Sequence, residues 1–260
     1  MTHSLYILDD SPWFEWIRLH STDSTIDFLK HYRPVSPKDM ILVTADFQTA
    51  GRGQAGNSWE SEAGKNLLFG LLFHPREVEA NRQFILSQAV ALSICETLSD
   101  YAEDIRIKWP NDIIMSGKKV CGILTEMSAQ FDYVNHIVVG IGINVQNKSF
   151  PKDIESVATS LFIETKEHYH RAELVERIWE AFEHYYEIFL QTEDLSGLVN
   201  EYNSHLVNMH QQVKVLDPKE PFEGKAMGIT PKGELIVDTW ESRKLVSTGE
   251  VSVRGIYGYV

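Results

Sequence analysis

The stretch "QTAGRGQAGNSW" (residues 48–59) contains three glycines and an arginine that could bind an anionic ligand. Gly51, Gly53 and Gly56 have the G-x-G-x-x-G spacing of dinucleotide-binding loops. The same stretch has the spacing of a phosphate-binding P-loop, except that Asn57 stands where a P-loop has its lysine. Both mechanisms require a helix directly after the loop, because its N-terminal N–H groups receive the phosphate.

The residues after this loop predict a strand rather than a helix. The segment "KNLLFGLLFHP" (65–75) is continuously apolar, without the 3.6-residue periodicity or the N-cap of a helix. Neither nucleotide mechanism is therefore favoured. A glycine-rich loop between strands can still direct N–H groups at an anion and open and close over a ligand, and Arg52 adds a positive charge. A plain surface connection is the alternative interpretation.

Composition narrows the class of partner. The chain has 24 basic and 37 acidic residues, and its net charge of -13 disfavours non-specific binding to nucleic acid or to anionic membranes. No stretch approaches the ~20 apolar residues of a membrane span, and the N-terminus has no signal-peptide pattern. Two cysteines, Cys95 and Cys121, predict no disulfide framework. We expect a cytoplasmic protein that binds a small molecule or another protein.

Hydrophobic patterns predict a large α+β domain. Strands are predicted at 39–47, 65–75 and 136–145, and amphipathic helices at 82–101 and 170–191. Between them, "IRIKWPNDIIMSGKKVCGILTEM" (105–127) predicts a strand interrupted at Pro110, and then a hairpin that turns at Ser116 and Gly117 into a second strand.

The pattern changes after residue 207. From 208 to 260 the chain consists of short alternating segments separated by glycine and proline turns. These segments predict a small β-barrel. We therefore expect a large domain over residues 1–207 and a small second domain over residues 208–260.

Five motifs in a fixed order resemble the catalytic domain of biotin protein ligases. They are "DST" (23–25), "GRGQAGNSW" (51–59), "KWPNDI" (108–113), "GKKVCGILTE" (117–126) and "GIGINV" (140–145). The resemblance covers about residues 18–260, because "GEVSVRG" (249–255) and the strands before it resemble the C-terminal barrel of the same family. It implies a fold of the class II aminoacyl-tRNA synthetase type, with a mixed or antiparallel sheet and helices, followed by an SH3-like barrel.

The resemblance implies a ligase with ATP and biotin as substrates and Mg²⁺ bound with the nucleotide. The biotin carboxylate attacks the α-phosphate of ATP, and a lysine of a biotin carboxyl carrier protein domain then accepts the biotinyl group. The first step brings an anion against a polyanion, so cations must stabilise the charge that develops. The resemblance assigns this role to Lys119, Lys108 and Arg52, and Asp112 is a hard oxygen ligand suited to Mg²⁺.

Further residues are assigned to ligand binding by the same resemblance. Those expected at biotin are Ser24, Thr25, Gln48, Gly51, Arg52, Gly53, Gln54, Lys119 and Gly122. Those expected at ATP are Trp59, Lys108, Asn111, Asp112, Lys119 and Asn144. Hydroxyl and amide side chains supply the donors and acceptors that the ureido head of biotin needs. Each assignment has a structural alternative, such as a turn-capping Asn111 or a solvated lysine on an edge strand.

Three features depart from the family pattern. Gln54 stands where many members have arginine, and Ile26 replaces a frequent polar residue after "DST". Regulatory members carry an N-terminal winged helix-turn-helix, whereas about fifteen residues precede the resemblance here. We expect a ligase that does not bind nucleic acid.

Two other functions stay open at this point. The first is a lipoate-protein ligase or octanoyl transferase, which shares the catalytic fold. The second is a biotin-binding sensor that no longer transfers its ligand. A second copy of the chain, in a homodimer, is an open alternative to a monomer.

Substituting Gln54 by arginine is expected to slow the escape of biotinyl-5′-AMP. Glutamine keeps hydrogen bonding but lacks the positive charge that would attract the adenylate phosphate. One added charge-assisted hydrogen bond corresponds to roughly a tenfold slower release. The measurement is the rate of adenylate release from wild type and Gln54→Arg after a single turnover, and equal rates would remove Gln54 from adenylate retention.

Overall fold

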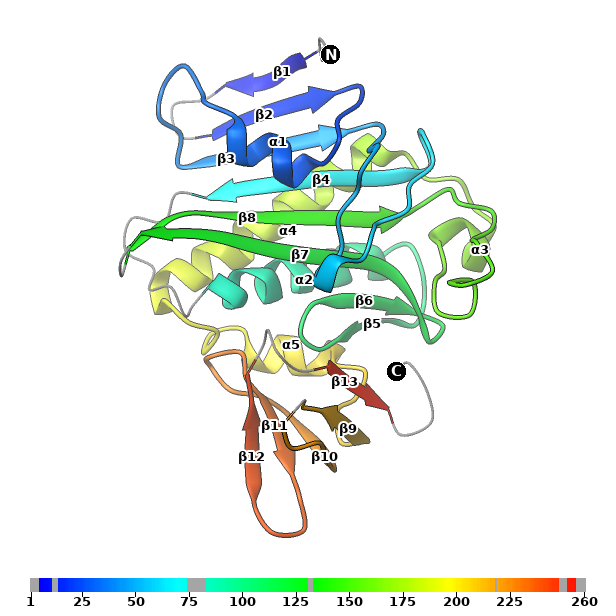
Figure 1. Cartoon of the computed structure of the whole chain (residues 1–260), viewed down its shortest axis with the longest axis vertical. Helices are drawn as coiled ribbons and strands as arrows, with labels where there is room; N and C mark the ends of the chain where they lie inside the picture. Colours follow the sequence, from blue (N-terminus) through cyan, green and yellow to red (C-terminus); the bar gives the residue numbers. More distant parts are fainter. Residues whose placement is uncertain are drawn as a thin grey trace. The chain divides into compact units, whose positions relative to one another are not determined.

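The computed structural model describes residues 5–10, 14–73, 83–130, 133–217, 219–247 and 252–255, and contacts divide the chain into two compact units (Figure 1). The first comprises Met1–Gln83, Cys121–Ser149 and Ser160–Arg171. The second comprises Phe84–Val120, Phe150–Thr159 and Ala172–Val260. Strand β7 (Lys118–Gln130) begins in the second unit and continues into the first.

The first unit is built on a mixed sheet whose strands have the order β1-β2-β3-β4-β8-β7. Besides β7, these strands are β1 (Leu5–Asp10), β2 (Phe14–Leu19), β3 (Met40–Ala45), β4 (Asn66–Phe73) and β8 (Tyr133–Asn144). Strands β2 and β3 are parallel, and the other neighbouring pairs are antiparallel. Strand β4 is buried along its whole length, which explains its continuous apolar sequence.

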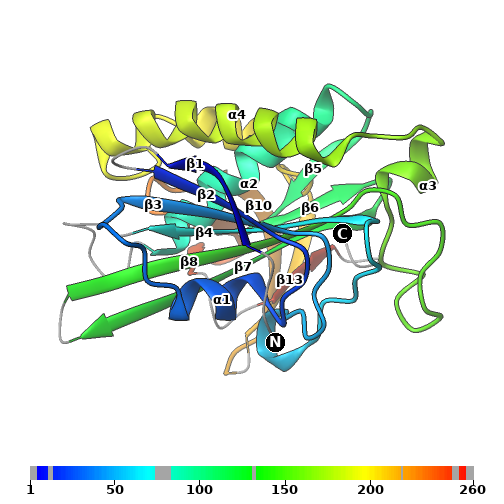
Figure 2. The same cartoon turned by 90° about the horizontal axis from the view of Figure 1, so that it is seen from above.

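Helix α1 (Thr25–His31) lies against one face of this sheet (Figure 2). Ile26 and Leu29 of the helix belong to a buried cluster with strand residues that include Val43 and Leu72. The side chain of Ile26 is only 3% exposed. Burial in this cluster accounts for an apolar residue where family members frequently have a polar one. The short helix α3 (Leu161–Thr165) also belongs to the first unit.

The second unit contains the long helices. These are α2 (Gln83–Ser99) and α4 (Arg171–Thr192), followed by the shorter α5 (Val199–His205). Helix α4 buries the predicted face, with Leu174, Ile178 and Phe182 among its buried residues. In the part of the chain that the structure describes, no helix is both long enough and apolar enough to cross a membrane.

Five short strands form the C-terminal sheet of the second unit, in the order β12-β11-β10-β9-β13. They are β9 (Gln212–Leu216), β10 (Phe222–Ile229), β11 (Leu235–Asp238), β12 (Arg243–Val246) and β13 (Ser252–Gly255). All neighbouring pairs are antiparallel. Parts of the predicted elements, at 74–75, 82, 218, 248–251 and 256–260, lie outside the described residues.

The structure differs from the sequence expectation at Pro110. The predicted single strand is instead a hairpin of β5 (Ile105–Lys108) and β6 (Asp112–Met115), in which Lys108 pairs with Asp112. The peptide bond between Trp109 and Pro110 is cis. Because the chain reverses direction here, the two ends of the "KWPND" motif lie opposite each other.

Residues 5–10 and 14–19 are a second difference. They form strands β1 and β2 of the first unit, although the family resemblance began only near residue 18. Strand β2 runs parallel to β3 from Phe14 to Leu19. This segment is therefore an integral part of the sheet.

Candidate active site

The predicted biotin residues of the first unit meet at the start of α1. Ser24 and Thr25 are buried, and both the backbone N–H and the hydroxyl of Thr25 donate to Oε1 of Gln48, at 2.8 and 3.0 Å. The backbone adds two further bonds, from Thr49 N to Thr22 O and from Ala50 N to Asp23 O, both 2.9 Å. Since Oε1 of Gln48 is engaged, the amide nitrogen is the part of this side chain that can donate to a ligand.

The glycine loop is a tight hairpin that leads into β4, as predicted. The N–H of Trp59 donates to Gly51 O at 2.9 Å, and that of Gly53 donates to Asn57 O at 2.7 Å. A Cβ on Gly51 would lie 2.5 Å from the carbonyl oxygen of Trp59, so the two arms require glycine here. Gly56 has a φ of +79°, which favours glycine at the turn.

The indole ring of Trp59 lies against Gly142 of β8, which has no side chain. A Cβ on Gly142 would be 2.4 Å from the indole ring, and Gly142 pairs with Gly122 across β8 and β7. The indole Nε1 is buried and has no hydrogen-bond partner among the described residues. Such a donor costs about 1–3 kcal/mol, which a ligand acceptor would recover. Nearby on β8, Oδ1 of the buried Asn144 accepts from Asn66 at 2.9 Å.

Arg52 is engaged by two carboxylates that the sequence analysis did not assign. Its Nη1 donates to Oδ1 of Asp27 at 2.7 Å, and both amino groups donate to Glu126, which also pairs with Lys30. Glu126 ends the quoted motif "GKKVCGILTE" and lies two and four residues from Leu124 and Gly122 on β7. The strand period of two could have placed Glu126 on the face of Gly122.

The predicted phosphate-contacting residues lie in the second unit. Nζ of Lys119 is 2.7 Å from Oδ1 of Asp112. Lys108 is only 6% exposed, and burial lowers its pKa to about 8, an effect that Asp112 opposes and Lys119 reinforces. Asn111 lies on the turn between Lys108 and Asp112. The N–H of Lys119 donates to Val157 O at 2.8 Å, which fixes the start of β7.

The turn of the β5–β6 hairpin is anchored to the C-terminal sheet of the same unit. Nε1 of Trp109 and Nε2 of Gln88 both donate to the carbonyl oxygen of Gly233, at 3.0 and 2.9 Å. The hydroxyl of Tyr202, on α5, donates to Pro110 O at 2.6 Å. No local sequence pattern indicates these anchors, because they join residues far apart in the chain.

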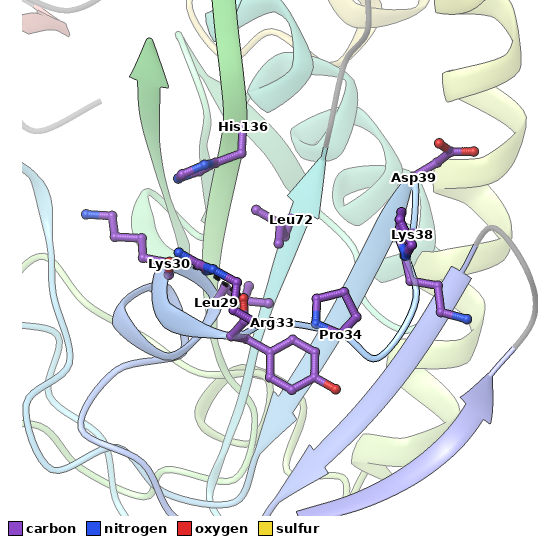
Figure 3. Close-up of a pocket in the computed structure, with 10 residues that line it drawn as sticks. Leu29, Lys30, Arg33, Pro34, Lys38, Asp39, Leu72 and His136 are labelled. Atoms are coloured by element: carbon purple, nitrogen blue, oxygen red, sulfur yellow. Dashed lines mark hydrogen bonds between the residues drawn. The ribbon is translucent and has the colours of Figure 1, made fainter. Parts of the chain in front are cut away.

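A cavity of about 460 Å³ lies beside the C-terminal end of α1 (Figure 3). Leu29 and Leu72 contribute apolar lining, and none of the predicted site residues lines it. Lys30 pairs with Glu126, and Arg33 donates to the carbonyl oxygens of its own helix end. These cations already have protein partners, so we assign no ligand to this cavity.

The residues that the structure describes contain no further metal-binding group and no reactive thiol. No group of three His, Cys, Asp or Glu side chains among them could hold a metal ion. Both cysteines are buried, and burial raises the pKa of Cys95 to about 12, so its thiol stays protonated.

Comparison with known proteins identifies the family. A model of the biotin/lipoate A/B protein ligase family matches residues 19–144, and a model of the biotin protein ligase C-terminal domain matches residues 211–254. The biotin protein ligase from Aquifex aeolicus, solved with biotin and ATP, is 30% identical to this chain with a TM-score of 0.79. That match covers 92% of this chain and 98% of the other. The chain belongs to the biotin protein ligase family.

Two curated family members show how the chain aligns with longer and shorter relatives. The bifunctional ligase/repressor BirA of Bacillus spizizenii is 34% identical over 216 residues, which is 82% of this chain and 66% of the relative. This chain thus spans about 66% of the length of that repressor-type ligase. The biotin–[acetyl-CoA-carboxylase] ligase of Paracoccus denitrificans is 29% identical over 91% of this chain and 100% of its own. The biotin ligase fold class predicted from the sequence is confirmed.

Lys108 makes the stability of this biotin ligase family member depend on pH. Its folded pKa of about 8 lies below the ordinary 10.5, so between these values the unfolded chain binds more protons. The contribution of Lys108 to the free energy of unfolding should therefore rise with pH across this window, by up to ~3 kcal/mol. Urea unfolding of wild type and Lys108→Met at pH 7.5, 9 and 10.5 tests this. A difference between the two proteins that stays constant with pH would contradict it.

Proposed function

We propose that this chain is an ATP-dependent biotin protein ligase. It converts biotin and ATP into biotinyl-5′-AMP and pyrophosphate, and then transfers biotin to a lysine of a biotin carboxyl carrier protein domain. The observation that carries the proposal is the pair of Lys119 and Asp112 beside the buried Lys108, in a chain of this family. The Aquifex relative solved with biotin and ATP supports both substrates.

In the first step, a carboxylate oxygen of biotin attacks the α-phosphorus of ATP and pyrophosphate leaves. Negative charge grows on the α-phosphate oxygens, where the ammonium groups of Lys119 and Lys108 stabilise it. Asp112 orients Lys119 through their 2.7 Å contact. The Asp112 carboxylate and the Asn111 amide would offer oxygen ligands to Mg²⁺, which would neutralise part of the phosphate charge of a bound nucleotide.

In the second step, the neutral amine of the acceptor lysine attacks the acyl carbon of the adenylate. The bond between that carbon and the phosphate oxygen breaks, AMP leaves with the electron pair, and the nitrogen loses a proton as the amide forms. Shielding the adenylate from water until the acceptor arrives is the task of the residues around it. We assign this task to the glycine loop, which the sequence predicts to act as a lid.

The binding residues of the first unit complete the proposal. Ser24, Thr25 and Gln48 supply donors and acceptors for the ureido head, and Gly122 leaves room for the ligand along β7. The loop residues Gly51, Arg52, Gly53 and Gln54 lie next to them in the chain. Trp59 and Asn144 are assigned to the adenine, whose ring nitrogens can accept from the buried indole N–H of Trp59.

The wider organisation is part of the same proposal. The catalytic domain spans 1–207 and the C-terminal domain 208–260, which is supported by the matched C-terminal family model at 211–254. A carboxylase carrier is the proposed acceptor, supported by the name of the Paracoccus relative. We place the protein in the cytoplasm, as a monomer or homodimer. Its net charge of -13 supports the proposal that it does not bind nucleic acid.

One experiment separates the proposal from its alternatives. The protein is incubated with ATP, Mg²⁺, a biotin carrier domain and either biotin or lipoate, and the acceptor mass and the pyrophosphate are measured. A biotinyl adduct supports the proposal, whereas a lipoyl adduct would establish the lipoate ligase. The match to a C-terminal domain of biotin protein ligases favours the first outcome. A sensor would release no pyrophosphate and leave the acceptor mass unchanged.

Replacing Lys119 by alanine is expected to lower the rate of pyrophosphate release by roughly 10²–10³, the usual cost of one preorganised charge stabiliser. The fold should survive, because the backbone N–H of Lys119 keeps its bond to Val157 O and the residue lies at the start of strand β7. Lys118→Ala is the matched control, since the neighbouring ammonium group donates only to a backbone carbonyl, Glu155 O, in an exposed contact. A near-normal rate in Lys119→Ala would exclude this lysine from the mechanism.

The protein is expected not to shift an operator DNA fragment, even with biotin and ATP present. Its net charge of -13 repels the phosphate backbone. An electrophoretic mobility assay at physiological salt tests this, with the Bacillus ligase/repressor as the positive control. A specific shift by this chain would contradict the assignment as a ligase without DNA binding.

A further inference from the structure

Four charged side chains from three separate segments form one ionic cluster in the first unit. We call Asp27, Lys30, Arg52 and Glu126 the Arg52 cluster. Asp27 and Lys30 come from α1, Arg52 from the glycine loop and Glu126 from β7. Arg52 donates to Asp27 at 2.7 Å and to both carboxylate oxygens of Glu126, and Lys30 pairs with Glu126 as well.

The geometry of the Arg52 cluster is that of a bidentate anchor. The planar fork of a guanidinium matches a carboxylate with two parallel N–H bonds, and Arg52 and Glu126 make this arrangement. The cluster contains two cations and two carboxylates, so its formal charge is balanced. A balanced cluster contributes little attraction for an anionic ligand, in contrast to an arginine that faces the ligand alone.

Arg52 is also the side chain that ties the glycine loop to α1 and β7. The backbone N–H groups of Gly53, Asn57 and Trp59 donate within the hairpin itself. The base of the loop is held by Thr49 and Ala50, which lie before the first glycine. Release of Arg52 would therefore leave the hairpin attached through its base and through Trp59, whose indole ring lies against Gly142, so the cluster holds the part of the loop between these points.

We propose that Asp27 and Glu126 are positioning residues that hold the glycine loop over the biotin site by binding Arg52. Arg52 then fastens the loop and does not give its charge to the ligand. That the ligand is biotin rests on the proposed function. That Arg52 holds the loop through Asp27 and Glu126 does not depend on it. The contacts are partly exposed, with 38% of Arg52, 35% of Asp27 and 21% of Glu126 accessible. Ion pairs of this kind are weak enough to open and close during turnover.

The two roles of Arg52 predict opposite effects of Glu126→Gln. If Arg52 fastens the loop, Glu126→Gln should speed the release of preformed biotinyl-5′-AMP by roughly three- to tenfold, as should Arg52→Ala. The double variant should be no faster than either single variant, because both remove the same contact. If Arg52 instead binds the ligand, Glu126→Gln frees its charge, and the adenylate should be held as tightly as in wild type or more tightly.

The matched control is Asp238→Asn, which removes the carboxylate of another bidentate arginine pair. In that pair Arg243 donates to Asp238 at 2.7 and 3.0 Å in the C-terminal sheet. Adenylate release from this control should equal that of wild type. Fast release from Asp238→Asn, or equal release rates from wild type and Glu126→Gln, would overturn the proposal.

A second readout does not depend on biotin or ATP. Hydrogen exchange of the Gly53 and Trp59 amides, measured without ligand, should be roughly three- to tenfold faster in Glu126→Gln and Arg52→Ala than in wild type and Asp238→Asn. Unchanged exchange in the cluster variants would overturn the fastening role. If wild type forms no adenylate, the proposed function fails, and faster exchange in these variants still supports the fastening role.

Discussion

In the proposed reaction two anions, a carboxylate and a polyphosphate, approach each other within a chain whose own net charge is -13. Several cations of the predicted binding residues and their surroundings pair with acidic side chains. Lys119 lies on Asp112, while Arg52 and Lys30 share Glu126. These pairs keep long flexible side chains in defined positions, and they limit the repulsion that grouped cations would cause. In each of the two units, the local electrostatics thus depend on the positions of carboxylates as much as on the positions of lysine and arginine side chains.

The position of Lys108 depends on burial within the second unit as well as on its neighbour Asp112. Its hairpin is anchored by the bond from Trp109 to the carbonyl oxygen of Gly233, which also accepts from Gln88 of α2, and by the bond from Tyr202 to Pro110. Burial makes the charged form of Lys108 more costly, which is why its pKa falls to about 8. A rigid turn is what keeps this lysine buried beside Asp112 and Lys119 rather than extended into solvent.

The sequence predicted those parts of the fold whose pattern is continuous and local. Strand β4 and helix α4 have long apolar patterns and lie where expected, and the Ser116–Gly117 turn is present. Helix α1 was missed because seven residues hold too few periods for a helix signal. The reversal at Pro110 was missed because a proline interrupts a strand pattern without determining the direction in which the chain continues.

The candidate site was predicted from motifs, and the motifs named ligand contacts rather than the contacts between protein residues. Glu126 stood at the end of a quoted motif without a role, because its partner Arg52 is 74 residues away. Likewise, nothing local to Trp109 indicated a bond to Gly233, 124 residues further on. Contacts of this length depend on how the chain folds back on itself, and a single sequence contains no periodicity that reports them.

Gly233 connects the C-terminal sheet to the rest of the second unit. This connection restricts which C-terminal sheets could be exchanged between related proteins. Its φ of +77° favours glycine, and a Cβ there would lie 2.0 Å from the side chain of Gln88. Its carbonyl oxygen also receives the bonds from Gln88 and Trp109. The glycine and its two donors therefore have to be inherited as a set. A chimera that joins the catalytic part of one relative to the C-terminal sheet of another must therefore carry Gly233, Gln88 and Trp109 together. Without them, the hairpin that contains Lys108 loses its hydrogen bond to the C-terminal part of the chain.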